Sequence, residues 1–192
     1  MHLSLAAFLL AAAALLAAPG PSNTLAGVAG MQDGLRRVVL LLPALVAGYL
    51  CAVLPLAWAG ANLTRVWPAL MPGIRLAAAA WVLWLAVGLW RAGPRGAHGG
   101  AVSAARLWLT TLLNPKALVV ALALLPPPAD PRFGLRLALF AAISAVVAFG
   151  WGAIGAATRT GDAAGRLVGL QRLAAVWLLV VSAGLALSVL RA

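Results

Sequence analysis

Six long apolar runs, separated by short polar stretches, make up most of this sequence. A membrane-spanning helix needs about 20 apolar residues, and each run is long enough to supply one. Backbone groups inside a bilayer must bond within their own segment, so the runs are predicted to be helices rather than isolated strands. Their approximate bounds are Leu3–Gly30, Val38–Ala61, Leu70–Trp90, Ala104–Leu125, Phe133–Ala157 and Leu167–Leu190. We therefore predict an all-α membrane protein with six transmembrane helices.

The composition excludes a soluble globular domain. Hydrophobic residues make up 65% of the 192 positions and charged residues only 9%, whereas an average soluble domain has roughly 25% charged residues. So many apolar side chains cannot be buried in a soluble chain of this size. No basic residue precedes the apolar stretch of the first run, which also resumes after its proline, so we expect a span rather than a cleaved signal peptide.

The net charge of +11 comes from arginines that lie singly or in pairs between the apolar runs. Arginines in such positions hold cytoplasmic loops in place. The charge therefore predicts the lipid bilayer as a partner and no nucleic acid. Termini that face outward would place eight arginines on the cytoplasmic side and five on the other side, which favours that orientation.

Groups that carry catalysis or bind metal are scarce. The chain has one cysteine, Cys51, two histidines and three aspartates. It can form no internal disulfide or dithiol pair, and no set of residues suggests a nucleophile with its base or a metal site. We expect no cofactor and no enzymatic activity, which leaves a membrane enzyme or electron carrier as a weak alternative. Cys51 is expected to be a small core residue.

Two of the runs are interrupted by proline at related positions. Pro19-Gly20-Pro21 interrupts the first run, and Asn114-Pro115-Lys116 interrupts the fourth. Positions 19 and 115 differ by 96, which is half of the 192 residues. Each half then holds three spans, so the two halves enter the membrane in opposite orientations, as in many secondary transporters. We predict an inverted repeat of residues 1–92 and 103–192, joined by a hinge loop at 93–102.

Each interruption is predicted to free backbone groups and to begin a new half-helix. Proline inside a helix removes a hydrogen bond and costs about 3 kcal/mol, and the freed groups need partners in a bilayer. Asn114 and Pro115 suit the N-cap and the first position of a helix, and Ser22, Asn23 and Thr24 are expected caps at the other break. Such helix starts attract carboxylates. The alternative is a structural kink packed by neighbouring helices.

Lys116 is the only lysine of the chain. A lysine in the middle of a membrane costs roughly 2.5–3.5 kcal/mol, so its presence suggests a role. It could bind a substrate carboxylate, take up and release a proton, or pair with carbonyls freed at Pro19-Gly20-Pro21. The alternative is a side chain that extends to the membrane surface.

Other polar or small residues lie in the spans. Trp151 could donate its indole N–H to the site. Asp130, at the end of the fourth run, is the acid nearest the predicted site and a candidate for coupling or gating. Ser144 is expected to bond the backbone of its own helix. Gly30-x-x-x-Gly34 matches a small-residue motif for helix packing.

Three segments together resemble a known family. Residues 19–25 read Pro-Gly-Pro-Ser-Asn-Thr-Leu, residues 112–117 read Leu-Leu-Asn-Pro-Lys-Ala, and Pro126, Asp130 and Pro131 follow. They resemble the Pro-Gly-Pro, Asn-Pro-Lys-Ala and Pro-Gln-Phe-x-Asp-Pro signatures of the lysine exporter family (LysE/RhtB) of bacterial amino-acid exporters. The resemblance covers the whole chain. It implies ion-gradient-driven export of small amino acids or related metabolites across the bacterial inner membrane.

The chain departs from that family at a few positions. Members often carry Gly-Asp in the second span, whereas Gly48 is followed here by Tyr49. Pro127 and Pro128 stand where Gln and Phe are expected. Without the acid, the resemblance favours a neutral zwitterionic substrate, with its carboxylate at Lys116 and the half-helix amides, and its ammonium at freed carbonyls and amide oxygens. The predicted substrate-binding residues are Pro19, Gly20, Pro21, Ser22, Asn23, Thr24, Asn114, Pro115, Lys116 and Trp151.

A non-transporting or degenerate membrane subunit of the same fold stays open, because Tyr49 and the altered proline segment depart from the family pattern. A channel is less favoured, since the sequence shows no ring of acids and no filter-like loop. Metal efflux would need ligands that the chain scarcely has. The partners expected are an amino-acid substrate, the lipid bilayer and, if the chain self-associates, a second copy of itself.

Overall fold

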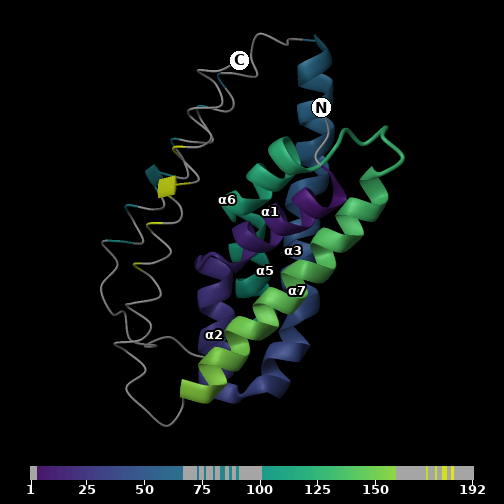
Figure 1. The fold of residues 1–192 in the computed structure, drawn as a ribbon. Coiled ribbons are helices and arrows are strands. Elements are labelled where there is room, and N and C mark those ends of the chain that lie inside the picture. Colours follow the sequence, from purple (N-terminus) through teal and green to yellow (C-terminus); the bar gives the residue numbers. More distant parts are fainter. Residues whose placement is uncertain are drawn as a thin grey trace.

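The computed structural model describes residues 4–66 and 101–158, with further single helical positions between 73 and 90 and between 172 and 183. These described residues contain helices and no strand, which confirms the all-α prediction for this part of the chain. The elements in Figure 1 are α1 (Leu5–Ala17), α2 (Pro21–Asp33), α3 (Leu35–Val66), α5 (Ala104–Leu112), α6 (Pro115–Val119), the π-helical segment η2 (Val120–Leu124) and α7 (Phe133–Ala157).

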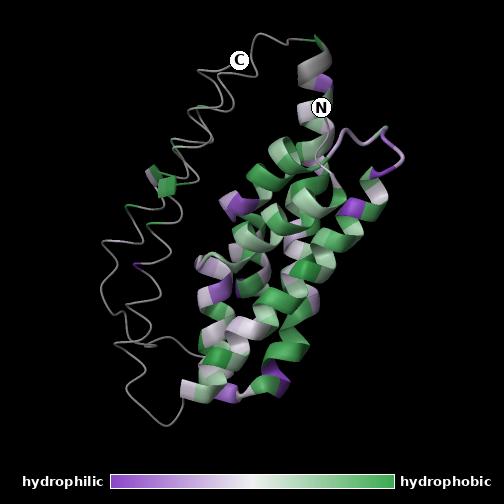
Figure 2. Cartoon of the chain, in the orientation of Figure 1, coloured by the Kyte–Doolittle hydropathy of each residue, from purple (hydrophilic) through white to green (hydrophobic). Residues whose placement is uncertain are grey.

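Two helices in the described residues are long and apolar enough to cross a membrane by themselves, at Leu35–Asn62 and Phe133–Ala157. Two bent pairs qualify when each is counted as one span. The α1–α2 pair is bent by 61°, and α5 is bent by 43° against the segment formed by α6 and η2. Apolar residues dominate α1, α3 and α7, whereas α2 is paler because it is built mainly from small and polar residues (Figure 2).

The four candidate spans correspond to the first, second, fourth and fifth predicted runs. The predicted breaks in the first and fourth runs are confirmed, since each run forms two helices with a bend between them. The third and sixth runs, at 70–90 and 167–190, lie largely outside the described residues, and so does the predicted hinge loop up to position 100.

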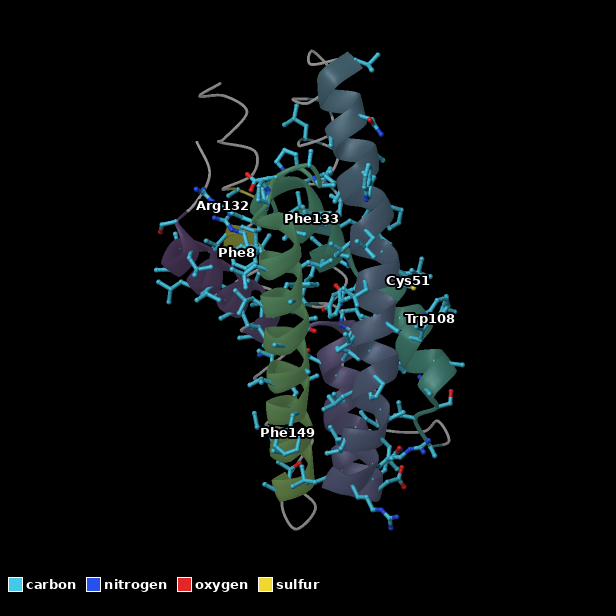
Figure 3. All side chains as sticks on the ribbon, turned by 90° about the vertical axis from the view of Figure 1, so that its right-hand side faces the viewer. Phe8, Cys51, Trp108, Arg132, Phe133 and Phe149 are labelled. Carbon is cyan, nitrogen blue, oxygen red and sulfur yellow. The ribbon has the colours of Figure 1, made fainter. Side chains whose placement is uncertain are left out.

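Helix α1 packs against the first part of α7 at one end of the bundle. Phe8 of α1 is fully buried there, and Figure 3 shows it beside the start of α7. The guanidinium of Arg136 lies over the Phe8 ring, 5.3 Å from the ring centroid. This cation–π contact accommodates a buried arginine within an apolar surrounding.

Helix α2 packs along α7 through four glycines, which we call the glycine seam: Gly27, Gly30, Gly152 and Gly155. A Cβ on Gly155 would lie 1.9 Å from the Gly27 carbonyl oxygen, and a Cβ on Gly30 would lie 2.0 Å from that of Gly152. The two backbones therefore touch directly. Of the predicted Gly30-x-x-x-Gly34 motif, Gly30 makes a close helix contact, whereas Gly34 lies beyond the end of α2, in the turn with φ of 78°.

Glycine also brings α3 close to α5. A Cβ on Gly48 would lie 2.6 Å from the Trp108 carbonyl oxygen. The neighbouring Tyr49 is buried, with 2% of its surface exposed. Cys51 was expected in the core, but it is exposed. Cys51 follows Tyr49 by two positions, and two positions along a helix place a side chain on nearly the opposite face. Figure 3 shows Cys51 on the outer side of the bundle near Trp108.

Candidate functional site

Buried polar side chains gather where the two bent pairs meet. The buried polar or charged residues in the described part of the chain are Ser22, Asn23, Thr111, Asn114, Lys116, Arg136 and Ser144. Ser144 donates to the Ala141 carbonyl oxygen at 2.8 Å, so the prediction that it bonds its own helix is confirmed. The first five residues and the hydroxyl of Tyr49 form one hydrogen-bonded group, which we call the polar cluster.

The first break consists of residues 18–20, between the end of α1 and the start of α2. The last carbonyl groups of a helix have no partner within it. In hydrocarbon such groups must find donors elsewhere in the protein. At this break the carbonyl oxygens that receive side-chain donors are those of Leu16, Ala17 and Ala18.

Two side chains share the carbonyls of Leu16 and Ala18. The Asn23 amide nitrogen donates to Leu16 O at 2.8 Å and to Ala18 O at 3.0 Å. The Lys116 ammonium donates to Leu16 O at 3.0 Å and also to Ala18 O. Each oxygen thus accepts two side-chain hydrogen bonds, which matches its two lone pairs. The acceptor capacity of these two oxygens is full.

A third donor comes from α7. The indole Nε1 of Trp151 donates to the Ala17 carbonyl oxygen at 3.3 Å. The first break therefore has its carbonyls bonded by residues of α2, α6 and α7, and Trp151 lies at this break as a hydrogen-bond donor. Pro19 and Gly20, the other residues of the break, are both buried.

Lys116 lies in the first turn of α6 and has only 3% of its surface exposed. The α6 dipole disfavours a cation at that position, whereas the carbonyl end of α1 favours one. The side chain therefore extends across the cluster to α1, where its ammonium group is buried. Of the roles expected for Lys116, the structure displays pairing with freed carbonyls. The lysine stem packs closely against Gly20, since a Cβ there would lie only 3.3 Å from Lys116 Cε.

Asn114 caps the second break locally. Its side-chain oxygen accepts a hydrogen bond from the Lys116 backbone N–H at 3.1 Å, and Pro115 occupies the first helical position of α6. Both features were predicted from the sequence and both are confirmed. The second break needs no side chain from another helix to satisfy this amide.

The two breaks are joined directly by side chains. The Asn114 amide nitrogen donates to Ser22 Oγ at 2.9 Å and to Tyr49 Oη at 3.2 Å. The Thr111 hydroxyl lies 3.0 Å from Ser22 Oγ and 2.8 Å from the Leu107 carbonyl oxygen, and its single proton can serve one of these acceptors at a time. Residues of α2, α3 and α5 thus meet around Asn114.

The start of α2 differs from the prediction. Its N-cap is Gly20 and no side chain caps it, so the expectation that Ser22, Asn23 or Thr24 would serve as a cap is wrong. The reason is that α2 begins at Pro21, which places these residues inside its first turn. The Thr24 N–H makes the first helical bond, to Gly20 O at 2.9 Å. The N–H groups of Ser22 and Asn23 have no partner within the helix.

The first break therefore presents two opposite partial charges. The carbonyl end of α1 attracts cationic donors, and the uncapped amide end of α2 attracts anions. The Lys116 ammonium lies between them, beside Gly20. Within residues 4–66 and 101–158, no carboxylate forms an ion pair with Lys116. The first break thus combines carbonyl oxygens that accept from an ammonium group with backbone amides of the kind that bind carboxylates.

Asp130, the expected coupling or gating acid, lies in the turn before α7 and outside both breaks. Its carboxylate accepts a hydrogen bond from the Arg132 backbone N–H at 2.8 Å, and its own N–H bonds to Pro127 O at 2.9 Å. The described part of the chain holds no group of three His, Cys, Asp or Glu side chains that could bind a metal.

Sequence reasoning missed the parts played by Tyr49 and Thr111. Tyr49 was noted only as a replacement for an acid, yet its hydroxyl bonds to Asn114, and its ring meets Phe140 edge to face at 5.4 Å. The signal that could have revealed Tyr49 is Gly48, which allows α3 to approach α5. Thr111 is a polar residue in an apolar run, three positions before Asn114.

These features define a helical chain with candidate membrane spans and a buried polar site at two helix breaks. Comparisons with models of protein families, with curated proteins and with solved structures found no match.

Proposed function

We propose that this chain is a secondary transporter that exports small neutral amino acids, or related metabolites, from the bacterial cytoplasm. It would be a multi-pass protein of the inner membrane, driven by an ion gradient and related to the lysine exporter family (LysE/RhtB). The observation that carries this proposal is the meeting of the two breaks. Lys116 of the second break bonds to carbonyls of the first, and Asn114 bonds to Ser22 of α2.

The proposed architecture is a pair of inverted three-span halves that give alternating access to the polar cluster. Helix α5 begins 99 positions after α1, and α7 begins 98 positions after α3. Both spacings are close to the 96 positions between Pro19 and Pro115. Each half starts with a broken span followed by a long apolar helix. Discontinuous helices that meet at a repeat interface are typical of substrate sites in transporters.

A neutral zwitterion fits the charges at the first break. Its ammonium group would bond to the carbonyl oxygens of Leu16 and Ala18, which already bind an ammonium group in the form of Lys116. Its carboxylate would bond to the amides of Ser22 and Asn23 at the uncapped start of α2 and to Lys116. A cationic side chain on the substrate would need an acidic partner, and the polar cluster contains none.

Amino-acid efflux from dipeptide-loaded bacterial cells tests the proposal, with all twenty amino acids measured in cells with and without the protein. We expect faster efflux of a neutral subset. Lys116→Ala and Asn114→Ala should abolish it while the protein still accumulates in the membrane. Arg106→Ala removes an exposed cation at the start of α5 and serves as the matched control. Full efflux in both cluster variants would contradict the proposed site.

The alternative is a non-transporting membrane subunit of the same fold. It is favoured by the complete bonding of the Leu16 and Ala18 carbonyls within the protein, which a purely structural clamp would also show. Unchanged efflux of every amino acid, with the folded protein present in the membrane, would support this alternative over the transporter.

A further inference from the structure

The ammonium group of Lys116 occupies the place that a substrate ammonium would need. It donates to the carbonyl oxygens of Leu16 and Ala18 at the end of α1. We call the carbonyl oxygens of Leu16 and Ala18 the ammonium subsite. We infer that Lys116 fills this subsite when no ligand is bound, and that the ammonium group of an α-amino acid displaces it. Lys116 then pairs with the carboxylate of the same amino acid. This inference rests on the proposed function, because the ligand class is the one proposed above.

Displacement follows from the capacity of the two carbonyl oxygens. Each oxygen already accepts one bond from Asn23 and one from Lys116, so neither has a lone pair left for a ligand. One of the two donors must leave before a third can bind. The subsite is therefore present in the structure but already filled.

Lys116 is the donor that can leave. Asn23 has a short side chain and stands on α2, which the glycine seam holds against α7. Lys116 has a flexible four-carbon stem, and its end lies against Gly20, where a Cβ would crowd Cε at 3.3 Å and Nζ at 3.5 Å. The ammonium can thus swing from the carbonyls of α1 toward the start of α2.

The exchange conserves charge within the buried site. A zwitterion adds no net charge, and its carboxylate gains Lys116 as a partner when its ammonium takes the carbonyls of Leu16 and Ala18. An amine without a carboxylate would leave two cations in a medium of low dielectric constant, where repulsion is strong. A carboxylate without an ammonium would leave Lys116 on the carbonyls. The site therefore selects molecules that carry both groups.

The first test uses the fact that Lys116 is the only lysine. Full-length protein in nanodiscs, grown with lysine labelled with carbon-13 at Cε, should give one lysine signal. Alanine, valine, leucine and threonine are titrated in turn, followed by leucinamide and N-acetylleucine. We expect at least one free amino acid to move the signal to a second, saturating position, and both blocked forms to leave it in place.

The second test uses Lys116→Met, which removes the internal ammonium and keeps a chain of similar length. In the wild type, we expect Lys116 to leave the subsite vacant in about a tenth of the molecules or fewer, and only these molecules can bind leucinamide. The Met variant has a vacant subsite in every molecule, so its apparent affinity for leucinamide should be about tenfold higher or more. The shift in melting temperature of the detergent-purified protein measures this affinity. Arg106→Met, which removes an exposed cation outside the cluster, should respond like the wild type.

Two results would overturn the inference. One is a lysine signal that no amino acid moves, and the other is a signal that N-acetylleucine moves as far as leucine does. The proposed function fails separately. If free amino acids displace Lys116 but no efflux occurs in cells, the exchange stands and transport does not. If efflux occurs while the lysine signal stays fixed, transport stands and the exchange does not.

Discussion

The two helix breaks satisfy their backbone groups in different ways. At the first break, with a bend of 61°, the carbonyls of α1 are bonded by Asn23, Lys116 and Trp151, which come from three other helices. At the second, with a bend of 43°, Asn114 caps α6 and Pro115 starts it. The second break is therefore encoded in neighbouring residues, whereas the first is complete only when the bundle has assembled.

This difference makes the first break depend on the second. Lys116 reaches the carbonyls of α1 because the cap at Asn114 begins α6 at the right place. The reverse dependence is weaker, since the bond from Asn114 to the Lys116 N–H involves no residue of α1 or α2. Changes at the first break should thus act through long-range packing, and changes at the second through local helix formation.

The largest expected effect comes from disturbing the glycine seam that holds α2 against α7. Gly155→Ala would place a Cβ 1.9 Å from the Gly27 carbonyl oxygen, and backbone cannot move aside as a side chain can. We expect the free energy of unfolding to fall by about 3 kcal/mol, the upper end of the usual cost of overpacking, measured by denaturation in mixed micelles. Gly150→Ala, in the same helix and with nothing near its Cβ, is the matched control and should change little.

A double-mutant cycle at the first break gives the next largest effect. Asn23→Ala and Lys116→Met each leave the carbonyls of Leu16 and Ala18 with one side-chain donor, whereas the double variant leaves them with none. Each unsatisfied buried group costs about 1–3 kcal/mol. The double variant should therefore lose more unfolding free energy than the two single variants together, by about 1 kcal/mol or more. Additive losses would show that the two donors do not share these acceptors.

The positions of both breaks, and the cap of the second, could be predicted from the sequence because they follow from neighbouring residues. Proline marked each break, and the order Asn114-Pro115 indicated the cap and start of α6. The exact start of α2 could not be predicted, because Pro19 and Pro21 both suit a helix start, and the choice of Pro21 placed Asn23 inside the helix.

The partners across the fold were not predictable in the same way. Sequence reasoning left several roles for Lys116, and the bond to Leu16 joins residues 100 positions apart. The contacts of Tyr49 and of the glycine seam were missed because the face of a helix that contacts a neighbour depends on where the other helices lie. In a chain with 20 glycines, no single glycine pair stands out as a contact.

The third prediction concerns the second break. Asn114→Ala removes the cap on α6 and should lower the free energy of unfolding by about 1–2 kcal/mol. Asn114→Asp keeps an oxygen that can accept from the Lys116 N–H but loses the donor to Ser22 and Tyr49. We expect the Asp variant to recover part of the lost stability. If it is no more stable than the Ala variant, the lost amide donor and the burial of a carboxylate together outweigh the local cap.

The smallest effect should come from Tyr49→Phe, which removes only the hydroxyl that accepts from Asn114 at 3.2 Å. The edge-to-face contact with Phe140 is retained, and Asn114 keeps its shorter bond to Ser22 at 2.9 Å. Side-chain hydrogen bonds between membrane helices average about 0.6 kcal/mol, so a loss of that order in unfolding free energy is expected. A loss as large as that of Asn114→Ala would mean that the second break also depends on a distant helix, and the contrast between the two breaks would disappear.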